Sequence, residues 1–253
     1  MSGSALLTLG FANADDLPRT VVMYTEAAIG LIMVALLISY LPTMYGAFSR
    51  RETAVTMLEV RAGSPPSAIE LIARYHHLKR FDHLHVLWEQ WEMWFAEIEE
   101  THTSLAALVF FRSPQPDHSW VTAAGAVLDS AALINAIVDT PRDVQADLCL
   151  RAGYIALQRI ADFFEIKYNA HPRPDDLISI ARAEFEAVCN DLATRGVPRK
   201  SDREQAWCDF SGWRVNYDTM LIALASLVGA PPAPWSSDRA AELDNFWYGR
   251  DLK

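Results

Sequence analysis

Residues 27–45 read AAIGLIMVALLISYLPTMY, a run of 19 residues without a charged side chain. In a helix with a rise of about 1.5 Å per residue this run would be roughly 28 Å long, which matches the hydrocarbon core of a bilayer. A buried core helix of a water-soluble domain is the alternative, but helices that are apolar on every face are seldom this long in small soluble domains. The run therefore predicts a membrane-spanning helix over about residues 21–48.

The charges on either side of this run predict its orientation. Arg50 and Arg51 follow it, whereas only Arg19 precedes it, together with the acidic pair Asp15 and Asp16. Lys and Arg gather on the cytoplasmic side of spanning helices, so we expect an inner-membrane or plasma-membrane protein whose C-terminal part is cytoplasmic. The acidic N-terminal flank does not suit a cleaved signal peptide.

Three residues within the predicted span are unusual for an apolar helix. Glu26 is ionisable and should face protein or water rather than lipid. Gly30 provides a flexible point, and Pro42 removes one backbone hydrogen bond and should bend the helix. Glycine and proline are common in spanning helices, so each of these two alone is compatible with simple tolerance.

The residues before the apolar run carry a second signal. The chain begins MSGSALLTLGFANADDLPRT, and within this segment Thr8-Leu9-Gly10-Phe11-Ala12 resembles the TVGYG selectivity filter of potassium channels. A short helix-like stretch precedes this motif, and a polar turn and the long apolar helix follow it. This order is similar to the pore helix, filter, turn and inner helix of two-helix potassium channels and related bacterial ion channels.

The resemblance implies a role for each part of this segment. Backbone carbonyls of the filter would replace the hydration shell of a permeant K⁺ ion, the Thr8 hydroxyl would close its inner end, and Phe11 would form the aromatic cuff. Gly30 and Pro42 would supply the gating hinge and the bend of the inner helix. Ala12 stands where the family has a second glycine, so a weakly selective cation pore is a variant of this hypothesis.

The same resemblance implies a larger assembly. Subunits of this kind have an outer helix before the pore helix, whereas the chain has only seven residues before the motif. We therefore expect an N-terminally truncated part of a longer subunit, which would form a homo-tetramer around one pore in contact with membrane lipid. K⁺ would be the permeant ion, and no cofactor is expected.

The remainder of the chain predicts an all-α bundle with no strand. Helical patterns cover the approximate ranges 67–80, 82–110, 119–138, 140–168, 175–195 and 201–228. Breaks rich in glycine and proline suggest four segments, which are a pore-loop segment at 1–17, the inner helix with its extension at 18–62, a cytoplasmic bundle at 63–230 and a tail at 231–253.

Local signals predict how these helices start and which face is buried. Ser67 and Ser201, each followed by glutamate three residues later, indicate capping boxes, and Thr140-Pro141 indicates a helix start. Apolar residues at spacings of three and four predict a core-facing stripe on the second helix of the bundle. Its members are Leu84, Leu87, Trp88, Trp91, Phe95 and Ile98.

Composition excludes several functions. The net charge is −10, and an acidic domain without clustered Lys and Arg does not suit nucleic acid. Three cysteines, Cys149, Cys189 and Cys208, form no C-x-x-C pair, so reduced thiols are expected rather than a disulfide framework or a zinc site.

One cluster of His and Glu residues is the best candidate for metal or acid–base chemistry. Its members are His76, His77, His83, His85, Glu92, Glu99 and His102. Glu99 and His102 form one Glu-x-x-His motif, whereas a di-metal site in a helical bundle requires two. We interpret the cluster as an exposed helix face, and we expect neither a metal site nor an enzyme.

Two functions remain open from the sequence. The first is a potassium-channel-like, cation-conducting subunit with a regulatory or assembly domain in the cytoplasm. The second is a single-span membrane anchor that carries a helical protein-interaction domain and has no pore activity.

Overall fold

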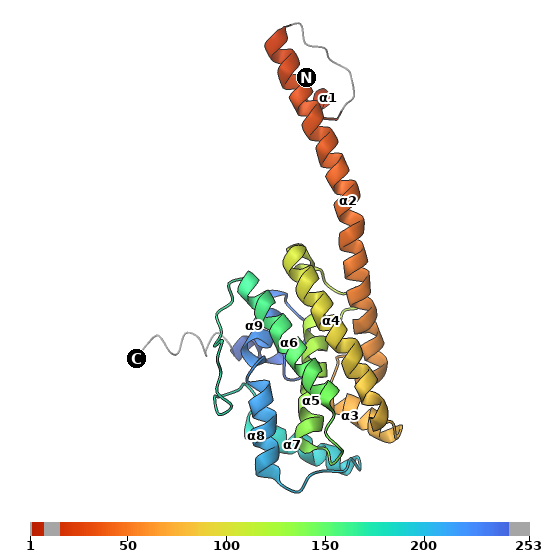
Figure 1. Ribbon diagram of the computed structural model, residues 1–253, viewed down its shortest axis with the longest axis vertical. Coiled ribbons are helices and arrows are strands. Elements are labelled where there is room, and N and C mark those ends of the chain that lie inside the picture. The colour runs from red at the N-terminus through yellow and green to blue at the C-terminus, as the bar shows by residue number, and fades with distance from the viewer. Residues whose placement is uncertain (1, 8–15, 243–253) are drawn as a thin grey trace, which may run out of the picture. The chain divides into compact units, whose positions relative to one another are not determined.

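The computed structural model describes residues 2–7 and 16–242, and the chain divides into two compact units, Met1–Ser49 and Arg50–Lys253. Within the described residues the regular elements are helices, accompanied by one isolated β-bridge between Val138 and Arg199, which confirms the all-α class (Figure 1). The division falls inside the longest helix, after Ser49, whereas that helix ends at Ala62, at the expected break at 63–66.

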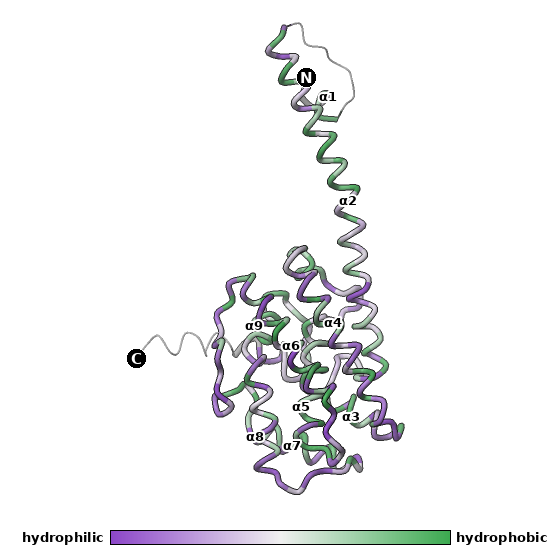
Figure 2. The backbone as a smooth tube through the Cα atoms, viewed as in Figure 1, coloured by the Kyte–Doolittle hydropathy of each residue, from purple (hydrophilic) through white to green (hydrophobic). Residues whose placement is uncertain are grey.

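The N-terminal unit contains α1 (Ser2–Leu6) and most of α2 (Leu17–Ala62). The tube in Figure 2 is mainly hydrophobic along this part of α2. Large apolar side chains here are exposed, and only 6% of the most apolar 18-residue stretch is buried. Two helices in the described chain are long and apolar enough to cross a membrane, and α2 is the one whose apolar surface is uncovered.

Helix α2 continues through Pro42 without a break. The proline ring removes one backbone donor, but nearby hydroxyl groups bond within the helix. Thr43 donates to the carbonyl of Ser39 at 3.0 Å, and Ser39 donates to the carbonyl of Leu36 at 3.1 Å. The polar side chains of this stretch therefore find partners on their own helix, which is what an apolar surrounding requires.

The second unit contains the remaining part of α2 and a helical bundle. The bundle comprises α3 (Ala68–His77), η1 (Phe81–His83), α4 (Leu84–Ser104), η2 (Ala106–Phe110), α5 (Trp120–Ile137), α6 (Val144–Phe163), α7 (Arg182–Thr194), α8 (Arg203–Arg214), α9 (Asp218–Leu227) and η3 (Ser237–Glu242). Helix α5 is central, since it packs against α3, α6, α8 and α9. It is the second apolar helix of membrane-crossing length, but 94% of it is buried inside the bundle.

The predicted apolar stripe on α4 is confirmed, because all six of its members are buried. The closest packing of this stripe occurs where α4, α5 and α6 meet. A Cβ atom on Gly153 of α6 would lie 2.4 Å from Leu128 and 3.0 Å from Phe95, so only glycine permits this approach. The interhelical contact therefore depends on the absence of a side chain at this position.

A buried ion cluster joins α5, α8 and α9. The guanidinium of Arg214 donates to Asp129 at 2.6 Å and to Asp218 at 2.7 Å, and the hydroxyl of Tyr217 donates to Asp129 at 2.8 Å. Burial alone would lower the pKa of Arg214, but the two carboxylates raise it overall, so the side chain stays charged. Arg214 also donates to the carbonyl of Trp235 at 2.6 Å.

That last bond corrects the expected tail at 231–253. Trp235 is buried, and Ser237 donates to the carbonyl of Pro231. The described residues 231–242 therefore belong to the packed domain, since they supply a partner for the buried Arg214.

Several expected helix starts are wrong because a different residue caps the helix. Asp143, not Thr140, caps α6, and its carboxylate accepts from the Gln145 backbone N–H at 2.9 Å. Asp202 caps α8 by accepting from the Gln205 N–H at 2.9 Å. The predicted start of α3 is confirmed, since Ser67 is its N-cap residue, but its side chain forms no capping hydrogen bond.

Three expected ranges also differ in length or continuity. Range 201–228 contains two helices, α8 and α9, and the turn between them allows Arg214 and Asp218 to meet inside the core. Range 82–110 is interrupted at Leu105, where the backbone leaves helical angles. Helix α7 begins at Arg182, later than the expected start at 175.

Candidate functional site

The residues of the expected ion filter, Thr8, Leu9, Gly10, Phe11 and Ala12, lie outside the described residues. Their role as a filter therefore stays a prediction. The expected hinge residues can be located, since Gly30 is buried and Pro42 is exposed on α2. Helix α2 passes through both residues without a break, which does not test a role in gating. That role therefore stays a prediction as well.

Gly30 marks the place where α1 packs against α2. A Cβ atom at this position would lie 1.8 Å from the carbonyl oxygen of Leu6, so the α1 backbone touches the α2 backbone there. Gly30 follows Leu17 by 13 residues, which corresponds to about 20 Å of helix. Figure 1 shows α1 beside α2, away from the start of α2.

A second group of residues holds the C-terminal part of α2 to the bundle. Arg51 is buried, and its guanidinium donates to the carbonyl oxygens of Leu108 at 2.7 Å and Phe111 at 2.5 Å. The same side chain pairs with Glu52 at 2.8 Å and contacts Nε2 of His102 at 3.2 Å. We call this group, with its centre at Arg51, the Arg51 clamp.

The neighbours of His102 define its protonation. An arginine only donates hydrogen bonds, so Nε2 must be the acceptor and Nδ1 must carry the proton, which it donates to Thr101 Oγ1 at 3.1 Å. Burial and the nearby charge of Arg51 lower the pKa of His102 to about 3. The imidazole is therefore neutral at physiological pH.

Further bonds fix the segment that the clamp contacts. The indole of Trp120 donates to the carbonyl of Val109 at 3.1 Å, and its ring lies 4.8 Å from the ring of His102. Buried His118 pairs with Glu59 of α2 at 3.3 Å. The Arg51 clamp therefore joins α2 to α4 and η2, and the His118–Glu59 pair is a second polar contact with α2.

The expected His and Glu cluster does not form one site. Glu99 pairs with Arg159, and Gln145 donates to Glu92. No group of three His, Cys, Asp or Glu residues within 2–7 and 16–242 could hold a metal ion. His102 is also buried rather than on the expected exposed face.

Sequence reasoning missed the clamp, although a signal existed. Phe95, Ile98 and His102 follow one another at spacings of three and four, so the buried stripe continues to the histidine. The pair Arg50 and Arg51 predicted only the orientation of the helix in the membrane. A pattern does not reveal that the side chain of Arg51 turns inward to satisfy two carbonyl groups 57 and 60 residues later.

The bundle also contains a cavity of about 470 Å³ between α5 and α8. Its cations are already engaged, since Arg142 pairs with Asp147 and Lys200 donates to the carbonyl of Asn135 at 2.5 Å. Exposed Cys208 lines the rim, whereas Cys149 and Cys189 are buried. Nothing in this arrangement points to a catalytic mechanism.

Comparisons of the chain with protein-family models, with curated proteins and with solved structures each find no match.

Proposed function

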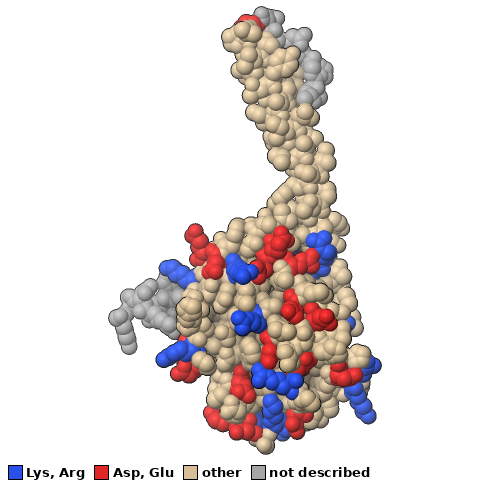
Figure 3. Space-filling model, viewed as in Figure 1, with Lys and Arg blue, Asp and Glu red and all other residues tan. Residues whose placement is uncertain are grey.

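We propose that the chain is a cation-conducting, potassium-channel-like subunit whose α2 crosses the membrane and whose bundle regulates or assembles the pore. One observation supports the membrane location above all. Most large apolar side chains from Leu17 to Leu41 are exposed on α2, and a continuous apolar surface of this size is costly in water. Figure 3 shows acidic and basic side chains over the visible face of the bundle, while the visible face of the N-terminal unit almost lacks them.

The position of α1 favours a pore loop over a plain anchor. A pore loop enters the membrane as a short helix, ends near mid-depth and returns as an extended filter to the outer surface. The contact between Leu6 and Gly30 lies partway along the apolar surface, and residues 7–16 connect this point to the start of α2. An extended chain of this length reaches up to about 30 Å, which is enough for the return.

The Arg51 clamp supports a regulatory role for the bundle. A rotation or tilt of α2 would have to carry Arg51 with it, and this movement would pull on the carbonyl groups of Leu108 and Phe111. Conversely, a ligand or partner that shifts this segment would act on the inner end of α2. The network is compact and polar, so it transmits a displacement rather than absorbing it.

Ion flux in liposomes tests the proposal. The chain, and the chain extended by any in-frame upstream sequence, should be reconstituted, and K⁺ and Na⁺ flux compared with the Gly10→Val variant. We expect flux from at least one form and its loss in the variant, because a branched side chain blocks the backbone angles of the filter. Ala12→Gly should raise the preference for K⁺. Absence of flux from both forms would contradict the pore.

A membrane-anchored interaction domain is the second candidate, and a groove in the second unit favours it. A cavity of about 300 Å³ lies between the Arg50–Ala62 part of α2 and α4. Met57 and Met93 on its rim are exposed, and Trp91 and Trp94 form its floor. Methionine-lined grooves adapt to apolar helices of partner proteins. Affinity capture from membranes with wild type and Met57→Glu would show a partner lost only in the variant.

A further inference from the structure

Four phenylalanines form a partly exposed aromatic surface at one end of the bundle, which we call the Phe patch. Phe110 and Phe111 end η2, and Phe163 and Phe164 end α6. The ring centroids of Phe110 and Phe164 are 5.6 Å apart, and those of Phe163 and Phe164 are 5.2 Å apart. Phe110 and Phe163 are 49% and 50% exposed, which is costly for neighbouring large apolar rings in water.

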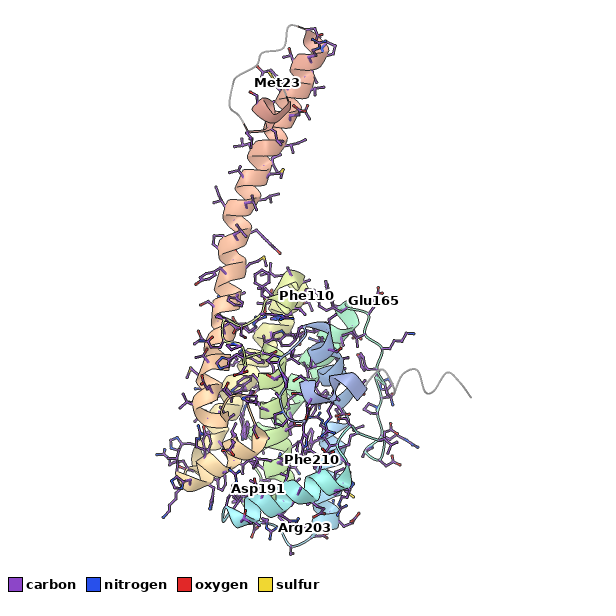
Figure 4. All side chains as sticks on the ribbon, turned by 180° about the vertical axis from the view of Figure 1, so that it is seen from behind. Met23, Phe110, Glu165, Asp191, Arg203 and Phe210 are labelled. Atoms are coloured by element: carbon purple, nitrogen blue, oxygen red, sulfur yellow. The ribbon has the colours of Figure 1, made fainter. Side chains whose placement is uncertain are left out.

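The patch lies beside the point where the chain enters the bundle. Arg51 donates to the carbonyl of Phe111, and Arg51 follows the end of the apolar run at Tyr45 by only six residues, or about 9 Å of helix. Figure 4 places Phe110 at the end of the bundle opposite to Asp191 and Arg203. The exposed rings thus lie close to Arg51, near the first residue of this unit.

Charged side chains of both signs border this surface. Arg112 directly follows Phe111 and is exposed, and the exposed carboxylates of Asp162 and Glu165 flank Phe163 and Phe164. Aromatic rings beside arginine suit the interfacial layer of a bilayer, where the rings reach apolar carbon and the guanidinium meets phosphate.

We propose that the Phe patch is immersed in the interfacial layer of the cytoplasmic leaflet, with Arg112 at the lipid phosphates. This inference rests on the proposed spanning role of α2. A lipid surface is favoured over a partner protein because Arg51, which donates to the carbonyl of Phe111, follows the apolar run by only six residues. The bundle is then held against the leaflet at two places, by α2 and by the patch, so lipid composition can bias the Arg51 clamp.

Spin labels in the full chain in nanodiscs of phosphatidylcholine with some phosphatidylglycerol test this proposal. On a Cys208→Ser background, labels at Phe110→Cys and Phe163→Cys report depth from their collisions with oxygen and with a water-soluble nickel complex. A label at Ala107→Cys leaves all four rings in place. It therefore reports the depth of the patch even if a variant that removes a ring does not fold. Leu177→Cys, 82% exposed in the wild type, is the aqueous control.

We expect several-fold fewer nickel collisions at 107, 110 and 163 than at 177. A label at Val34→Cys on α2 separates this inference from the proposed function. If the label at 34 reports lipid while the labels at 107, 110 and 163 report full exposure to water, the proposed immersion of the Phe patch is overturned. The proposed spanning helix would then remain intact. An aqueous label at 34 would overturn both.

Discussion

Nη1 of Arg51 donates a hydrogen bond of 2.7 Å to the carbonyl oxygen of Leu108, and this bond ties α2 to η2. Arg51 belongs to the helix that carries the apolar run, whereas Leu108 belongs to the segment that bears the Phe patch. The other hydrogen bonds of the guanidinium join it to Glu52, to Nε2 of His102 and to the carbonyl of Phe111. The guanidinium therefore fixes one orientation of α2 against the bundle.

Arg51→Met should destabilise the bundle more than a change at its neighbour. The variant removes the partner of buried Glu52 and the bonds to the carbonyl groups of Leu108 and Phe111, so we expect the free energy of unfolding to fall by about 3 kcal/mol. Arg50→Met is the matched control, because Arg50 pairs with Glu97 on the surface and should cost less than about 1 kcal/mol. Denaturant titration followed by circular dichroism measures both, and equal losses would show that the clamp has no special role.

His102 should make the stability of the bundle depend on pH. Its pKa is about 3 in the folded protein, against 6.5 for an ordinary histidine, so the unfolded chain binds a proton between these values and the folded chain does not. The contribution is complete above pH 6.5 and is lost as the pH falls below it, by about 2 kcal/mol at pH 5.

Comparison with His102→Gln isolates this contribution from other titrating groups. The glutamine cannot take up a proton, and its side-chain oxygen can still accept from Arg51. We expect the stability difference between the two proteins to shrink or reverse in favour of the variant from pH 7 to pH 5. A constant difference across this range would mean that His102 is not a buried neutral base.

The clamp and the ion cluster show which parts of the fold a sequence reveals. The length of the apolar run predicted α2, and the spacing of Trp88, Trp91 and Phe95 predicted the core face of α4, because both depend on local periodicity. Arg214 and Asp129 could not be paired in advance, since they lie 85 residues apart and meet only after α5 and α8 have packed.

The same difference between local patterns and long-range contacts applies to the candidate site. Gly30 was expected as a hinge from the resemblance to potassium channels, whereas its contact with Leu6 became visible only once α1 and α2 were placed together. Helix starts were predicted wrongly where two nearby residues could each cap the helix, as at Thr140 and Asp143. The tertiary path of the loop selects between them.

Gly153 and Gly212 offer a matched test of packing in the bundle. Alanine at 153 would press on Leu128 and Phe95, so we expect a net loss of about 1–3 kcal/mol. Alanine at 212, inside α8, meets only Pro174 at 3.7 Å and should stabilise the protein by up to about 1 kcal/mol through helix propensity. Thermal melts of the two variants should therefore shift in opposite directions, and a shift in the same direction would contradict the contact at α6.

Gly30→Ala should release α1 from α2, because the new methyl group would overlap the carbonyl oxygen of Leu6. Gly3→Ala in α1 is the control, since no atom lies within 4 Å of a Cβ there. Amide exchange of residues 2–7 in nanodiscs should accelerate at least tenfold in the first variant and remain unchanged or slow in the second, because lost packing opens a short helix. Unchanged exchange in Gly30→Ala would exclude this contact and weaken the pore-loop proposal.

The most direct test of the account is the position of α2 across a membrane. Intact cells that express the full chain should be treated with a membrane-impermeant maleimide before and after permeabilisation. We expect native Cys208 to react only after permeabilisation, Leu17→Cys on a Cys208→Ser background to react in intact cells, and Val34→Cys on that background to react in neither condition. Rapid labelling of Val34→Cys in water after permeabilisation, in a folded protein, would contradict the spanning helix.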